Sequence, residues 1–145
     1  MKRYINDIPF NMIHLCIDYF DNYSMKGRAY NSTVKNPLIF EDINEVFLKF
    51  ENVFDHNGNP LAWQFHRSFD KKENVNAYCH KPEEVNDYKD LMEYHGDMET
   101  MDIVVKSRRL NEWQGVLYVK GQKYTYQSVG ELVMRMIHVL EKKMS

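Results

Sequence analysis

Two stretches of the chain, one near each end, show the same succession of hydrophobic and polar patterns. Each begins with short segments rich in β-branched, aromatic and aliphatic residues, separated by polar turns, which is the composition of β-strands. The strands are expected at 12–20, 25–31 and 38–40 in the first stretch, and at 101–108, 113–120 and 124–126 in the second. The chain is therefore predicted to carry a group of strands at each end.

An amphipathic helix is predicted after each group of strands. Asp42 and Ser128 each stand three residues before a glutamate, Glu45 and Glu131, which is the spacing of a capping box. Hydrophobic residues then recur at helical spacing and form one apolar stripe per helix. The first stripe comprises Ile43, Val46, Phe47, Phe50, Val53 and Phe54, and the second comprises Val129, Leu132, Val133, Met136 and Leu140.

The two stretches align at a nearly constant offset, which indicates an internal repeat. Gly27 aligns with Gly115 at an offset of 115 − 27 = 88 residues, and Asp42 aligns with Ser128 at 128 − 42 = 86 residues. A repeat of this length must bury its helix against a neighbouring unit. We therefore predict an α+β fold in which two ββ(β)α repeats fuse into one antiparallel sheet, with both helices on one face.

The repeats organise the chain as one domain, residues 1–145. Repeat one covers 12–56 and repeat two covers 101–143, and residues 57–100 form an insertion between them. Within the insertion, a proline at the start and a glycine just past the end predict a helix at about 83–95.

Composition and charge narrow the function classes. The 145 residues carry a formal net charge of −2, so no global basic field attracts nucleic acid or anionic lipid. No apolar run approaches the roughly 20 residues that span a bilayer, and no signal peptide is evident. A cytoplasmic protein is expected, without a membrane partner and with Cys16 and Cys79 as free thiols.

Strand alternation predicts a group of cations, amides and tyrosines on the sheet face opposite the helices. Aromatic rings among cations on an open sheet bind single-stranded nucleic acid, because bases stack on the rings and phosphates meet the charges. The arrangement resembles that of PUR-type single-strand binders, without their sequence motifs. The other interpretation is an ordinary solvated sheet face. Strand alternation also assigns Asp18 and Phe20 to this face. The candidate surface comprises Lys26, Arg28, Tyr30, Lys106, Arg108, Gln114, Tyr118 and Lys120.

Residues typical of catalysis or metal binding do not form a known pattern. His66, Cys79, His80 and His95 lack the spacings of zinc ligands. His14 and Cys16 share a strand face, but a strand cysteine is more commonly a buried residue than a nucleophile. We therefore expect no metal, no cofactor and no catalytic residue.

Two segments have the composition of protein-binding hot spots, with aromatic residues beside arginine. One supplies the candidate partner contacts Trp63, Phe65, Arg67 and Phe69. The other runs from Arg108 to Gly115, and in it we expect Trp113 to belong to the core.

These segments resemble a family of small uncharacterised proteins of gut clostridia and related Firmicutes. In that family an arginine-rich hairpin leads into Trp-Gln-Gly, and a segment in the middle of the chain ends in Arg-Ser-Phe. Leu110 departs from the tighter spacing of the family's hairpin. The resemblance implies no established activity. The matching residues include Gly27-Arg28, Tyr30, Gln64, Arg67-Ser68-Phe69, Arg108-Arg109, Asn111, Trp113-Gln114-Gly115, Gln127-Ser128 and Glu131-Leu132.

The sequence therefore favours a non-enzymatic binding module, an intracellular regulatory or accessory protein that acts through a protein partner. Its size and duplicated scaffold fit bacterial or mobile-element regulators and phage-encoded inhibitors. A single-stranded nucleic-acid-binding protein is the alternative, and a small enzyme of unknown type is third. The oligomeric state is open.

Overall fold

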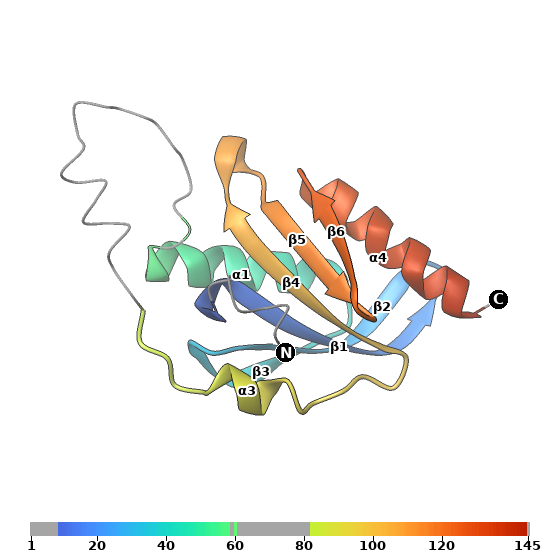
Figure 1. Cartoon of the computed structure of the whole chain (residues 1–145), viewed down its shortest axis with the longest axis horizontal. Helices are drawn as coiled ribbons and strands as arrows, with labels where there is room; N and C mark the ends of the chain where they lie inside the picture. Colours follow the sequence, from blue (N-terminus) through green and yellow to red (C-terminus); the bar gives the residue numbers. More distant parts are fainter. Residues whose placement is uncertain (1–8, 59, 61–81, 145) are drawn as a thin grey trace.

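The fold is a six-stranded antiparallel sheet with two long helices on one face (Figure 1). The structure is a computed structural model, and it describes residues 9–58, 60 and 82–144. The α+β class and the antiparallel sheet are as predicted. The strand order is β3-β2-β1-β4-β5-β6, so the first strand of each half lies at the centre. The strands are β1 (Met12–Asp21), β2 (Ser24–Asn31), β3 (Val34–Phe40), β4 (Glu99–Ser107), β5 (Gln114–Val119) and β6 (Gln122–Tyr126).

Both halves have the element order βββα, and the two halves meet where β1 pairs with β4. His14 lies opposite Asp102 in this pairing, and Ile13 lies opposite Ile103. The separation of His14 and Asp102 is 102 − 14 = 88 residues, which equals the offset between the two sequence stretches. The His14–Asp102 pair therefore stands at equivalent positions of the two halves.

A β-bulge interrupts each half at an equivalent position. The register of β1 with β2 shifts between Ile17 and Tyr19, and that of β4 with β5 shifts between Val105 and Ser107. Gly27 lies opposite Ile17 and Gly115 lies opposite Val105. A Cβ atom at either glycine would overlap a backbone carbonyl of the neighbouring strand. Glycine is thus required because the neighbouring backbone approaches closely.

The two long helices are α1 (Ile43–Asn57) and α4 (Val129–Met144), and both begin where the capping boxes predict. The Asp42 carboxylate accepts a hydrogen bond from the N–H of Asn44 at 2.8 Å, which satisfies one of the unpaired donors of the first turn. Ser128 Oγ accepts from the N–H of Glu131 at 3.0 Å.

The glutamate of each box reaches one residue further back than a standard capping box. Glu45 accepts from the N–H of Glu41 at 2.9 Å, and Glu131 accepts from the N–H of Gln127 at 2.8 Å. The same variation in both helices makes their N-terminal turns equivalent.

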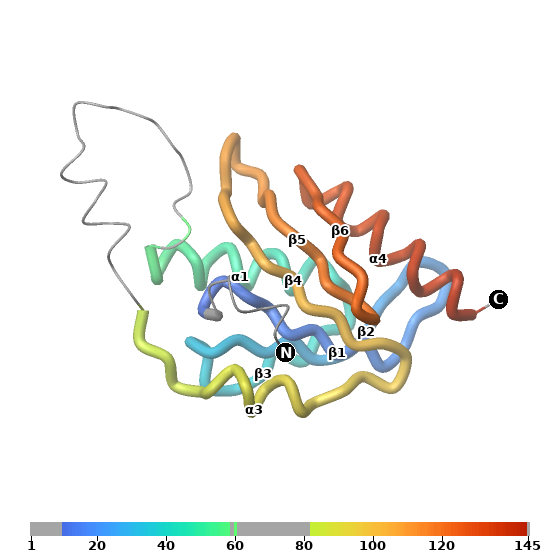
Figure 2. The backbone as a smooth tube through the Cα atoms, in the orientation of Figure 1, coloured from blue at the N-terminus to red at the C-terminus, as the bar shows by residue number. Residues whose placement is uncertain are grey.

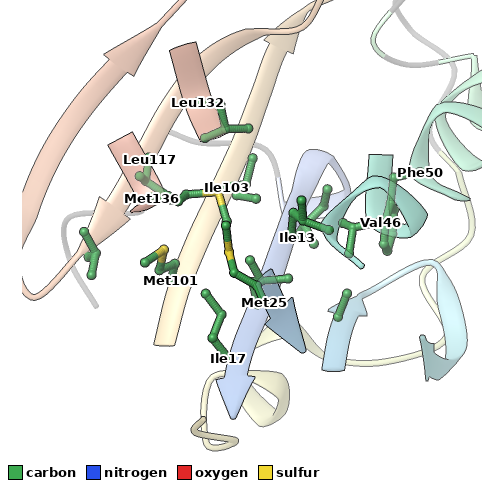
Figure 3. Close-up of a cluster of buried hydrophobic side chains, with 14 of the residues drawn as sticks. Ile13, Ile17, Met25, Val46, Phe50, Met101, Ile103, Leu117, Leu132 and Met136 are labelled. Carbon is green, nitrogen blue, oxygen red and sulfur yellow. The ribbon is translucent and has the colours of Figure 1, made fainter. Parts of the chain in front are cut away.

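The main core fills the space between the sheet and the two helices (Figure 3). Ile13 and Ile103 point into it from the central strands, and Phe50 and Met136 from the helices. The predicted apolar stripes of both helices belong to this core or pack against it. Burial of these side chains stabilises the domain, at roughly 1.5–3 kcal/mol each before conformational entropy is subtracted.

The helix predicted at 83–95 is wrong in extent, because within these residues only the single turn α3 (Tyr88–Leu91) is helical. Its N-cap is Asp87, whose carboxylate accepts from the N–H of Lys89. The backbone before this turn bonds to the sheet instead, since the N–H groups of Val85 and Asn86 both donate to the carbonyl of Ser32. Residues 82–98, here called the covering segment, run beside the sheet toward β4 (Figure 2). No helix among the described residues is long and apolar enough to cross a membrane.

Candidate functional site

The covering segment lies on the sheet face opposite α1 and α4, the face that sequence alternation predicts to be open. Tyr94 of this segment stacks on Tyr30 of β2, with ring centroids 4.6 Å apart and planes within 6°. Arg28 donates to the carbonyl of His95 at 2.7 Å and also binds the carboxylate of Asp18. The segment thus occupies the position in which a base would stack on Tyr30.

A buried charge pair lies beneath the covering segment. His14 Nδ1 is 2.7 Å from the carboxylate of Asp102, and His14 Nε2 is 2.7 Å from the carbonyl of Tyr94. Both partners are hydrogen-bond acceptors, so both ring nitrogens must carry a proton. Burial alone would lower the pKa of His14. The hydrogen bond and charge of Asp102, aided by Cys16 and the Tyr94 carbonyl, outweigh it and raise that pKa from 6.5 to about 10. His14 is therefore an imidazolium at neutral pH.

Three residues of the candidate surface are buried, which corrects their assignment to an open face. Tyr30 is 8 % exposed, Arg108 2 % and Tyr118 5 %. Arg28 and Gln114 are partly exposed, while the side chains of Lys26, Lys106 and Lys120 reach the surface. The eight residues therefore do not form one continuous open surface.

The β-bulges explain the residues that sequence alternation assigned to the wrong face. Each bulge inserts one extra residue, so every side chain beyond it changes face. Arg108 follows the bulge in β4 and lies on the helix side, against α1. Phe20 follows the bulge in β1 and belongs to the main core. Strict alternation without the bulge predicts the opposite for both.

Arg108 joins β4 to the C-terminal half of α1. Its guanidinium donates to the carbonyl of Pro60 at 2.7 Å and to the carboxylate of Asp55 at 3.0 Å, with a carboxylate oxygen of Glu51 at 3.3 Å. It also lies 5.7 Å from the centre of the Phe54 ring. Arg108 is therefore a buried residue whose guanidinium links the end of β4 to α1.

Replacing Arg108 by methionine is expected to lower the free energy of unfolding by about 2 kcal/mol. The substitution keeps the aliphatic volume but leaves the Pro60 carbonyl without its donor. The Glu51 and Asp55 side chains are 41 % and 55 % exposed, so they stay hydrated and limit the loss. Urea unfolding measures it, and Arg109→Met, at an exposed side chain, is the matched control with a change below about 0.5 kcal/mol. Equal effects of the two substitutions would contradict the role of Arg108.

The rest of the Arg108–Gly115 segment also has structural contacts. Trp113 belongs to the core as predicted, lying edge-on to Phe47 and Phe54 and donating its indole N–H to Glu51 at 2.7 Å. Gln114 closes the hairpin, accepting from Ser107 Oγ and from the N–H of Arg109. The hairpin tip is different: Leu110 is 92 % exposed and has a positive φ of 56°.

The equivalent junction in the other half, between the β1–β2 hairpin and α4, contains a hollow of about 760 Å³ with mostly apolar walls. Tyr23 of the hairpin and Ile137 and Glu141 of α4 line it. A smaller hollow, lined by Phe20, Tyr23, Glu141 and Met144, adjoins the same hairpin. Sequence reasoning missed this site, and the signal that could have found it is the non-glycine residue Tyr23 in a hairpin turn.

The residues at the two offsets differ between the junctions. Arg108 corresponds to Phe20 (108 − 88 = 20), and Glu51 corresponds to Ile137 (51 + 86 = 137). At these offsets the second junction has two apolar residues, where the first has the Arg108–Glu51 ion pair. Asp55, the other acid that contacts Arg108, aligns with Glu141 (55 + 86 = 141), which lines the hollow.

Tyr23 holds a conformation that a tyrosine rarely adopts. Asn22 and Tyr23 have φ values of 50° and 65°, as in a type I′ turn, whose second central position favours glycine. Tyr23 is 66 % exposed. The side chain therefore costs the fold about 1 kcal/mol of strain without a compensating burial.

Several candidate residues lie outside the described residues, namely Trp63, Phe65, Arg67, Phe69, His66, Cys79 and His80. Within the described part of the chain, no three His, Cys, Asp or Glu side chains are grouped to hold a metal ion. Cys16 is buried and forms no disulfide with a described residue.

Comparisons of the chain with protein-family models, with curated proteins and with solved structures find no match. The resemblance to the clostridial family therefore stays a prediction.

Proposed function

We propose that the protein is a non-enzymatic, intracellular binding module that holds a protein partner in the hollow beside α4. Exposed Tyr23 carries this proposal. Strain of this kind persists where function uses it, and tyrosine is enriched among the residues that dominate binding energy. The regulatory or accessory role expected from the sequence fits a protein that acts by contact with its partner.

The hollow supports the same proposal through its chemistry. Met134 and Met144 are exposed on α4 and line the two hollows, where their flexible side chains adapt to a partner's surface. Glu131 and Glu141 give the mostly apolar site two acidic groups, and the carboxylate of Glu131 lies 3.5 Å from Arg135, which also lines the hollow. A partner segment with an apolar or aromatic side chain beside a basic one matches these walls.

We further infer that the two halves arose from one duplicated unit. The equivalent bulges, left-handed hairpin turns and helix caps support this origin. It makes the hollow a divergent copy of the junction that Arg108 fills.

The single-stranded nucleic-acid alternative has less support. Tyr30, Arg108 and Tyr118 are buried, and the covering segment brings Glu84, Asp87, Asp90 and Glu93 to the same side of the sheet. These acidic groups repel phosphates.

Replacing Tyr23 by glycine separates binding from folding. We expect Tyr23→Gly to keep or raise the free energy of unfolding, by up to about 1 kcal/mol, because glycine adopts the positive φ without strain. Partner affinity is expected to fall at least about tenfold, the effect of losing one hot-spot residue. Urea unfolding measures the first effect, and affinity capture from the source organism with quantitative mass spectrometry measures the second.

Leu110→Gly is the matched control, since it relieves the same strain at the other hairpin tip. A protein retained by the wild type and by Leu110→Gly but lost from Tyr23→Gly supports the proposal. If every captured protein binds Tyr23→Gly as well as the wild type, the hollow is not the binding site.

A further inference from the structure

The two edges of the sheet are protected to different degrees. Edge strand β3 contains Pro37, its register with β2 is shifted after Ala29, and the side chain of Asn86 donates to the carbonyl of Val34 at 2.8 Å. Proline, a bulge and a covering segment are devices that prevent a sheet edge from pairing with another chain. At the other edge, β6 has no proline and a continuous register with β5.

The β5–β6 hairpin determines which groups β6 presents at its outer edge. Lys120 and Gly121 form a two-residue turn with positive φ values of 54° and 77°, so the flanking Val119 and Gln122 form a hydrogen-bonded pair. Hydrogen-bonded and non-hydrogen-bonded pairs alternate along antiparallel strands. The N–H and C=O groups of Lys123 and Thr125 therefore point away from β5. No hydrogen bond from the described residues reaches them.

We propose that β6 pairs with β6 of a second copy of this chain, antiparallel and about a twofold axis at Tyr124. In this register Lys123 faces Thr125 of the second copy, and the two residues exchange hydrogen bonds on both sides of the axis. Both members of each pair are outward-facing, so the register satisfies the groups that β6 leaves unpaired. The result is one continuous sheet through two copies.

The side chains around β6 are compatible with self-pairing. The axis brings Tyr124 opposite its own counterpart, an aromatic pair of the kind that stabilises adjacent strands. Lys123 faces a threonine and not another lysine, so like charges are not directly opposed. Arg135 lies 5.7 Å from the centre of the Tyr124 ring and 3.5 Å from the Glu131 carboxylate. Each copy therefore contributes one acidic side chain, Glu131, and one basic side chain, Arg135, near the axis.

The test measures the mass of the full chain by sedimentation equilibrium between about 1 and 500 μM, the range for a small interface. The wild type is expected to dimerise within this range. Thr125→Pro removes two intermolecular hydrogen bonds per dimer but none of the β5–β6 ladder, and should weaken association about 10- to 100-fold. Thr125→Val keeps the N–H group and should dimerise like the wild type. A monomeric wild type, or a Thr125→Pro protein that associates equally well, would overturn the proposal.

Cysteine cross-linking tests the register without a proline. In a Cys79→Ser background, Tyr124→Cys places two thiols opposite each other at a non-hydrogen-bonded pair, about 4.5 Å apart between Cα atoms, and oxidised glutathione should link them. Lys123→Cys, whose counterpart lies across the axis at a distance too great for a disulfide, should link much more slowly. Equal rates would exclude this register. Tyr124, Glu131 and Arg135 also line the hollow, so the two proposed surfaces adjoin. Tyr23 lies on the β1–β2 hairpin and not on β6, so Tyr23→Gly should dimerise normally, and failure of the dimer stays distinguishable from failure of the binding function.

Discussion

Asp102→Asn is expected to lower the free energy of unfolding by about 3–5 kcal/mol, the range for removing one member of a buried ion pair. The substitution preserves the shape of the side chain but removes the carboxylate beside the buried His14 imidazolium. The Tyr94 carbonyl still accepts from the other ring nitrogen, so the loss reports on the charge. Urea unfolding at pH 6 measures it. An effect below about 1 kcal/mol would show that the pair contributes little.

The same pair predicts a pH dependence of stability. The pKa of His14 is 6.5 in the unfolded chain and about 10 in the folded protein, so the folded state binds the extra proton between these values. This contribution to stability is complete below pH 6.5 and is lost as the pH rises toward 10. We expect the wild type to lose several kcal/mol over this range, by the linkage of about 1.4 kcal/mol per pKa unit. Asp102→Asn should show a much smaller loss, and identical slopes would contradict the assignment.

Gly115→Ala is expected to destabilise the protein by at least about 3 kcal/mol, at the upper end of overpacking effects. The added methyl group overlaps the carbonyl of Val104, and backbone yields less readily than the end of a side chain. Thermal unfolding should show a melting temperature lower by roughly 10 °C. Gly121→Ala and Gly130→Ala help to calibrate the effect. A Cβ atom at Gly121 meets no neighbour, although its φ is positive, and one at Gly130 meets only Ser128 Oγ at 3.8 Å. Gly130→Ala should therefore be close to neutral, and a comparable loss there would show that the β4–β5 approach is not the cause.

Periodicity predicted the elements that bury one regular face. The stripes of α1 and α4 and their capping residues could be found because helical spacing and caps are local signals. The same signals failed at residues 83–95, where the backbone donors of Val85 and Asn86 bond to Ser32 instead of forming a helical turn. Local sequence carries no information about such a partner more than 50 residues away.

The candidate site was less predictable than the fold. A bulge that changes the face of Arg108 and Phe20 depends on how two strands approach each other, and alternation along one strand does not reveal it. The hollow beside α4 is lined by residues of distant elements, such as Tyr23 of the β1–β2 hairpin and Ile137 of α4, and local sequence does not show that they meet. Tyr23 did carry a local signal, because a tyrosine stands where a two-residue hairpin favours glycine.

The central pairing of β1 with β4 has a consequence for the speed of folding. The hairpins β1–β2 and β5–β6 need only local contacts, which form in microseconds. His14 and Asp102, by contrast, are 88 residues apart in the chain. Closing a loop of that length costs conformational entropy before the contacts between the two halves can stabilise it. We therefore expect the docking of one half onto the other to be the slow step of folding, because the shared interior forms only when the two halves meet.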